Sequence, residues 1–343
     1  MGRFIGNRFG SIAPVVADDP AVSAVYTMSD QYYIKQDGGW IVPMTATGGS
    51  KSNPSPTIAK HVFTATGPFT VDSGSGTITY LLLSGGGGGS AGGGGGGGIK
   101  YGTMPAVQPG PYPVTVGTGG AKGADPNDAN MGGKGGTSSW AGPTTVSIAG
   151  GGGGFRWGYH TGNVPTAQLD AAQGATGGGA GNRVDGSGGT GEGDKTPNAA
   201  PADQSSPTNG WGCNGGGCGG SPEGQGAGGG GGAGNNGEGP RPDGSGNSGG
   251  EGLVYSMHPA YPSAVGGGGG GGGREPGCGA GEGVDQGGGT YGDGVTGGPG
   301  DELGKDGNNQ YGGGGGGGGY ASDTGYPAGG EGGDGLVVLQ YPL

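Results

Sequence analysis

Histidine is the residue type in this chain best suited to acid–base or metal chemistry, and it is scarce. The three histidines, His61, His160 and His258, are widely separated, and no nucleophile or metal-binding motif accompanies them. The sequence therefore gives little support to catalysis. We expect a protein that is not an enzyme and has no cofactor.

The three cysteines are too few to form a disulfide framework. Cys213 and Cys218 could form a disulfide or half of a metal site, but a zinc site usually takes four ligands and no second pair is present. We favour free, inert thiols at Cys213, Cys218 and Cys278, and expect no bound metal.

Aromatic side chains gather in two segments, which are candidate contact surfaces because aromatic residues and arginine are favoured anchors in recognition. The candidates for receptor contact are Phe155, Arg156, Trp157, Tyr159 and His160 in the segment 155–160, and Tyr255, His258 and Tyr261 in the segment 253–262. The alternative interpretation is structural packing, in which Phe155 and Trp157 cap the end of a glycine stack. Trp211 is expected to pack structurally.

Several ligand-binding motifs occur here through composition alone. Gly-x-Gly-x-x-Gly recurs, but no copy lies in the strand–helix unit that binds a dinucleotide. Residues 329–337 fit the calcium-binding nonapeptide pattern, yet such sites need stacked consecutive repeats and this copy stands alone. We interpret it as the segment that leads into the last strand.

The composition limits how these residues can be positioned. Glycine supplies 108 and proline 25 of 343 residues, and hydrophobic residues make up only 28%, too few to fill one large side-chain core. Either the chain is largely disordered, or something other than side chains orders it.

The net charge of −12 argues against a nucleic-acid partner. No stretch approaches the ~20 apolar residues that span a bilayer, so we expect no membrane insertion.

Strand-forming residues bracket the glycine-rich region, and this favours order. Residues 1–45 are poor in glycine and carry aromatic residues, as expected of an attachment segment, and residues 46–57 are predicted to be a linker. The remaining domain, 58–343, has predicted strands within 59–83 and at 112–116, 144–148 and 335–341. We expect the last strand to return to the sheet that begins near residue 60.

Between the strands lie glycine runs, which we predict to be stacked polyglycine-II helices. Without side chains such three-residue helices can approach closely and hydrogen-bond to their neighbours through the backbone. The runs are 85–89, 92–98, 150–154, 177–179, 215–217, 228–232, 266–273 and 312–319. The predicted fold is thus mostly irregular and β: stacked polyglycine-II helices with long loops, bracketed by a small antiparallel β-sheet.

Several motifs resemble those of a known family. Residues 63–71, residues 77–83 running into polyglycine, and residues 113–120, 144–155 and 332–341 resemble the glycine-rich domains of phage tail-fibre proteins, and residues 1–40 look like the start of tail proteins from tailed phages. The tip adhesins of T-even-like phages are similar in using stacked polyglycine helices as a frame, with terminal loops that recognise the host.

The resemblance implies a virion structural protein at or near the tail tip, made in the host cytoplasm. Residues 1–45 would dock on other tail proteins, and loops of a homo-oligomer would contact a bacterial surface receptor, either a protein or a glycan. The alternative is a structural protein of a virion or extracellular filament that packs against copies of itself without binding a receptor.

Overall fold

The computed structural model describes residues 43–123, 131–156, 170, 172–181, 210–218, 226–239, 241, 243–259, 263–273, 281, 303–309, 311–319 and 328–343. These residues belong to one compact unit, Pro43–Leu343. Most of the predicted attachment segment lies outside them.

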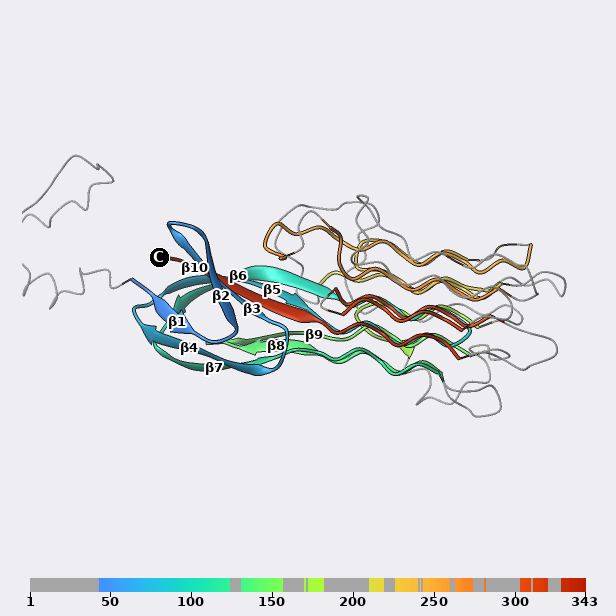
Figure 1. Cartoon of the computed structure of the whole chain (residues 1–343), viewed down its shortest axis with the longest axis horizontal. Coiled ribbons are helices and arrows are strands. Elements are labelled where there is room, and N and C mark those ends of the chain that lie inside the picture. Colours follow the sequence, from blue (N-terminus) through green and yellow to red (C-terminus); the bar gives the residue numbers. More distant parts are fainter. Residues whose placement is uncertain are drawn as a thin grey trace, which may run out of the picture. The chain divides into compact units, whose positions relative to one another are not determined.

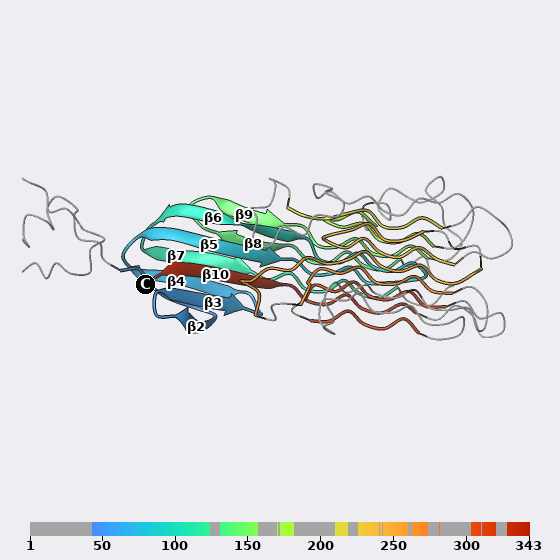
Figure 2. The same ribbon diagram turned by 90° about the horizontal axis from the view of Figure 1, so that it is seen from above.

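The assigned elements are strands that form two antiparallel sheets of five strands each (Figures 1 and 2). The first sheet has the order β1 (Thr45–Thr47), β4 (Gly67–Ser73), β7 (Gly110–Thr115), β8 (Ser138–Ala141) and β9 (Thr145–Ile148). The second sheet has the order β2 (Ser50–Ser55), β3 (Ile58–Phe63), β10 (Leu336–Pro342), β5 (Gly76–Leu83) and β6 (Ile99–Val107). The protein is therefore mostly β, as predicted, but with two sheets in place of one small sheet.

The C-terminal strand lies in the middle of the second sheet. In β10, Val337 pairs with Phe63 of β3 on one side and with Leu82 of β5 on the other, both antiparallel. This confirms the prediction that the last strand returns to the sheet begun near residue 60.

A hydrophobic core lies between the two sheets, and the alternation of side chains along the strands builds it. In β3 the buried positions Ala59, His61 and Phe63 alternate with partly exposed ones, as a period of two requires. The largest fully buried side chains of this core are Trp140, Tyr341, Phe69, Ile78, Leu82 and Leu339.

The segment 46–57, predicted as a linker, instead contributes most of β1 and all of β2. Gly48 and Gly49 have φ angles of 110° and 56°, so they form the turn by which the chain passes from the first sheet to the second. The side chains of β2 are largely exposed. This strand at the sheet edge is held by backbone pairing with β3, which a search for hydrophobic strand patterns does not detect.

The glycine segments continue directly from the strands and run side by side away from the sheets (Figures 1 and 2). Segment 85–90 follows β5, and segment 92–98 leads back into β6. In the same way, segments 117–123 and 150–155 follow β7 and β9, while segments 131–136 and 328–335 lead into β8 and β10. We call these segments, together with 172–181, 211–218, 226–233, 235–239, 243–252, 266–273, 303–309 and 312–319, the glycine bundle.

Candidate functional site

The glycine bundle begins where the side-chain core between the sheets ends. At this junction the buried Ser138 of β8 accepts a hydrogen bond from the Gly117 N–H at 2.9 Å and donates one to the Leu83 carbonyl at 2.7 Å. Leu83 ends β5 in the opposite sheet. One hydroxyl therefore links the two sheets at the point where they come together.

Beyond this junction the backbones of the two layers are in direct hydrogen-bonded contact. Sheets that pack through side chains lie about 10 Å apart, whereas segment 85–90 from the second sheet bonds directly to segments 117–123, 131–136 and 150–155 from the first. The absence of side chains allows this approach, so backbone groups take the place of a side-chain core.

The hydrogen bonds of segment 85–90 repeat every third residue. Its N–H groups donate at 2.7–3.1 Å to three neighbouring segments in turn. The donors are Gly85 and Gly88 toward 131–136, Gly86 and Gly89 toward 328–335, and Gly87 and Ser90 toward 92–98.

The carbonyl groups of the same segment follow the same period toward three further segments. The acceptors are Gly85 and Gly88 from 150–155, Gly86 and Gly89 from 117–123, and Gly87 and Ser90 from 312–319. Segment 226–233 has an equivalent environment: it donates to 266–273, 172–181 and 235–239, and accepts from 92–98, 211–218 and 243–252. Each of these two segments is thus enclosed by three donor and three acceptor neighbours.

The close approach of the backbones explains why these positions are glycine. A Cβ atom on Gly86 would lie 2.2 Å from the Gly313 carbonyl oxygen, and one on Gly89 would lie 2.1 Å from that of Gly316. Real Cβ atoms essentially never come this close to another heavy atom. Any side chain at these positions must therefore push two segments apart.

At one edge of the bundle, side-chain oxygens take the place of a neighbouring backbone. Asp306 accepts the Glu331 N–H at 2.8 Å, and Asn309, three residues on, accepts the Asp334 N–H at 3.1 Å. Asp334 in turn accepts the Gly119 N–H at 2.7 Å. The three-residue period persists here, with carboxylate and amide oxygens as acceptors.

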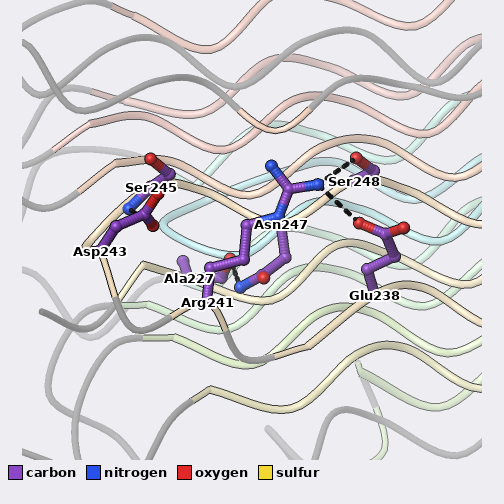
Figure 3. A network of polar contacts seen from close by, with 7 residues as sticks. All are labelled: Ala227, Glu238, Arg241, Asp243, Ser245, Asn247 and Ser248. Atoms are coloured by element: carbon purple, nitrogen blue, oxygen red, sulfur yellow. Dashed lines mark hydrogen bonds and ion pairs between the residues drawn. The ribbon is translucent and has the colours of Figure 1, made fainter.

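A second polar edge lies around residues 238–248 (Figure 3). Arg241 donates to Glu238 at 2.9 Å and to the Ser248 hydroxyl at 3.4 Å, and the side-chain amide of Asn247 donates to the Ala227 carbonyl at 2.9 Å. A backbone hydrogen bond from Ser245 lowers the pKa of Asp243. The Arg241–Glu238 pair is about half exposed, so its contribution to stability is at most about 1 kcal/mol.

The segments 253–259 and 263–265 cover part of the outer face of the second sheet. Leu253, Tyr255, Met257 and Val265 pack in one cluster with Leu81, Leu83, Ile99, Leu336 and Val338. The candidate contact residues Tyr255 and His258 are 0% and 2% exposed, with Tyr255 against Tyr101 and His258 against Tyr311. This burial favours the packing interpretation of both residues.

The other candidate segment begins inside the bundle. Phe155 is 2% exposed, packs with Met131 and Ala172, and its backbone bonds to segments 92–98 and 172–181. It therefore lies where the capping interpretation places it. Arg156 follows at partial exposure, whereas Trp157, Tyr159, His160 and Tyr261 lie outside the described residues.

Trp211 forms an antiparallel bridge with Ile99 and packs at the border of the cluster beneath segments 253–259 and 263–265, which confirms its structural role.

Cys213 and Cys218 are buried and neither is in a disulfide, whereas Cys278 lies outside the described residues. Within the described part of the chain, no group of three or more His, Cys, Asp or Glu side chains could hold a metal ion. A search of the same residues finds no helix that could cross a membrane.

Sequence reasoning missed Ser138, Asp306, Asn309 and Asp334. For Ser138 and Asp334 a signal exists, namely a polar residue where a glycine-rich stretch meets a strand, whereas Asp306 and Asn309 lie far from any strand in the sequence and carry no such signal.

A comparison with curated proteins finds no significant match. The family model described as a glycine-rich domain matches residues 64–342, which include strands β4 to β10 and the bundle but not β1, β2 and β3. The chain therefore belongs to the family of proteins that contain this glycine-rich domain.

Proposed function

We propose that the bundle segments are polyglycine-II helices. The hydrogen-bond period of three and the three donor and three acceptor neighbours of segments 85–90 and 226–233 support this, because the polyglycine-II helix has three residues per turn. So do the φ angles: among the described glycines of these two segments, none has a positive value. Backbone angles measured by NMR on glycine-labelled protein would test the assignment, and extended β values throughout would contradict it.

We further propose that the protein is a structural component of a phage tail fibre or tail tip, and that the bundle presents recognition loops to a bacterial surface. The observation that carries this proposal is the backbone core, because a frame bonded laterally on all sides can hold loops in fixed positions without a large side-chain core. Residues 1–45 would attach the chain to other tail proteins.

The order of the segments along the chain distinguishes the two ends of this frame. One end of the bundle adjoins the strands, and segments 117–123 and 150–155 end, and segment 131–136 begins, at the end remote from them. The candidate segment 155–160 therefore starts at the remote end, whereas residues 253–257 of the other candidate segment pack against the second sheet. Of the two, we propose 155–160 as the recognition segment, with Trp157, Tyr159 and His160 as its contact residues.

A cell-binding experiment tests the proposed function. The full chain, fused to a fluorescent protein, is incubated with a panel of bacterial strains and binding is measured by flow cytometry. We expect binding to some strains, its loss when residues 157–160 are replaced by Gly and Ser, and its retention when the exposed Thr77 and Thr103 become Ala.

Failure to bind any strain, together with polymerisation that rises with concentration in analytical ultracentrifugation, would contradict receptor recognition and favour a self-packing structural protein. The described surface argues against that alternative, since only Leu303 and Leu343 among its large hydrophobic side chains are exposed. The acidic net charge of −12 also opposes packing of copies against one another.

A further inference from the structure

Asn236 and Gly237 lie on an edge segment of the bundle and form a sequence with its own chemistry. In an Asn-Gly pair the glycine nitrogen can attack the side-chain carbonyl carbon of asparagine, because glycine has no Cβ to hinder the approach and gives the backbone the required freedom. Asn236 is exposed to water, which the later hydrolysis consumes.

The structure holds both reacting groups in hydrogen bonds to the neighbouring segment. The side-chain oxygen of Asn236 accepts the Asn214 N–H at 2.9 Å, and the Gly237 N–H donates to the Asn214 carbonyl at 2.9 Å. The Asn236 N–H donates to the side chain of Asn235, also at 2.9 Å. The glycine nitrogen therefore cannot turn toward the side-chain carbon while segment 235–239 stays in the bundle.

We propose that Asn236 is a conditional modification site, protected in the bundle and converted to aspartate or isoaspartate when segment 235–239 detaches. The Gly237 nitrogen loses its proton and forms a bond to Cγ of Asn236. The bond from Cγ to Nδ2 breaks, and the amide group leaves as ammonia after taking up a proton. Water then opens the cyclic imide at either carbonyl carbon, and no oxidant or reductant is needed.

The isoaspartate product prevents the segment from returning to its place. It adds one carbon to the backbone, whereas segment 235–239 accepts hydrogen bonds three residues apart, from Gly232 to Asn235 at 2.9 Å and from Gly229 to Glu238 at 3.2 Å. A longer backbone between these acceptors puts one of them out of register. The modification thus makes a reversible local opening permanent.

The experiment compares conversion at Asn236 in the native full chain, in the chain unfolded by urea, and in two glycine variants, at mildly alkaline pH. Cleavage after glutamate yields the peptide 224–238, which separates Asn236 from the Asn-Gly pair at Asn214. Mass spectrometry then follows the replacement of the amide by a carboxyl group, and fragmentation assigns it to Asn235 or Asn236.

The variant Gly216→Ala should open the site, since its Cβ would lie 1.9 Å from the Glu238 carbonyl oxygen. Gly67→Ala is the control, because a Cβ at Gly67 meets nothing within 4 Å. We expect conversion in the native chain and in Gly67→Ala to be about tenfold or more slower than in urea, and conversion in Gly216→Ala to approach the unfolded rate.

Conversion of the native chain at the unfolded rate would overturn the proposal. So would a Gly216→Ala chain that converts as slowly as native protein. If Gly216→Ala does not fold, the comparison of native and urea-unfolded wild-type chain decides alone. The expected result is a rate of conversion that already rises at urea concentrations below global unfolding. A rate that stays constant over those concentrations would overturn the proposal.

Discussion

At the scale of single residues, the place of a side chain in the fold decides what it can do. Phe155 and Tyr255 are of the aromatic type that contact surfaces favour, yet both are buried by segments distant in the sequence. A sequence pattern identifies such residues but does not tell which distant segment will cover them. Asp334 shows the reverse, because its role depends on Gly119, whose distance along the chain gives no hint of contact.

Replacing a bundle glycine by alanine should destabilise the protein strongly. In Gly269→Ala the new Cβ would lie 2.2 Å from the Gly315 carbonyl oxygen, so two segments must separate. We expect a loss of roughly 3 kcal/mol in the free energy of unfolding, measured by urea denaturation. Gly67→Ala is the matched control and should change it little; equal stability of the two variants would refute close backbone packing.

His61 should make stability depend on pH. It is fully buried in the side-chain core, and its Nδ1 lies 2.7 Å from the Gly48 carbonyl oxygen. Burial lowers its pKa, an effect that Lys51 reinforces and that the Gly48 hydrogen bond and Asp72 oppose. As the pH falls, His61 is therefore protonated at a higher pH in the unfolded chain than in the folded chain. The free energy of unfolding is thus highest above the unfolded pKa of about 6.5 and decreases below it.

The measurement is urea denaturation at about pH 7.5 and about pH 5.5, on either side of the ordinary histidine pKa. Wild-type protein should lose stability between the two, and His61→Gln, which retains polar groups without titrating, should lose less. An identical loss in both proteins would show that His61 does not contribute.

At the scale of elements, the sequence predicts the strands whose hydrophobic residues alternate or cluster and misses those held by backbone pairing. β3, β4, β5, β7, β9 and β10 lie close to predicted positions. β2 has no hydrophobic residue, β8 (Ser-Ser-Trp-Ala) has Trp140 as its one large hydrophobic side chain, and Gly102 and Pro105 interrupt the pattern of β6. These three strands take their conformation from partners, so local sequence carries little sign of them.

Ser138 should matter more than its neighbour in β8, because it joins the two sheets at the start of the bundle. Ser138→Ala leaves the buried Gly117 N–H and Leu83 carbonyl without this hydroxyl, at a cost of about 1–3 kcal/mol for each group left unpaired. Ser139→Ala, on the other face of the strand, is the control. Thermal unfolding should show a clearly lower Tm for Ser138→Ala only; equal Tm values would contradict a linking role for Ser138.

At the scale of the whole molecule, two kinds of core follow one another along the same chain. Between the sheets, hydrophobic side chains exclude water; in the bundle, backbone groups bond to neighbours on all sides. Composition alone left disorder or a core without side chains as alternatives, because 28% hydrophobic residues cannot fill a large core, and the strand-forming residues that bracket the glycine runs favoured order. It could not predict which segments become neighbours, since polyglycine has the same sequence in every register.

Amide hydrogen exchange in segment 85–98 tests the backbone core most directly, because this segment lies deep in the bundle and pepsin is expected to release it between Leu83 and Tyr101. If the bundle is a core, its amides should exchange only through large-scale unfolding, as slowly as those of strands β5 and β10. Exchange as fast as in the urea-unfolded chain, while β5 and β10 stay protected, would contradict the account.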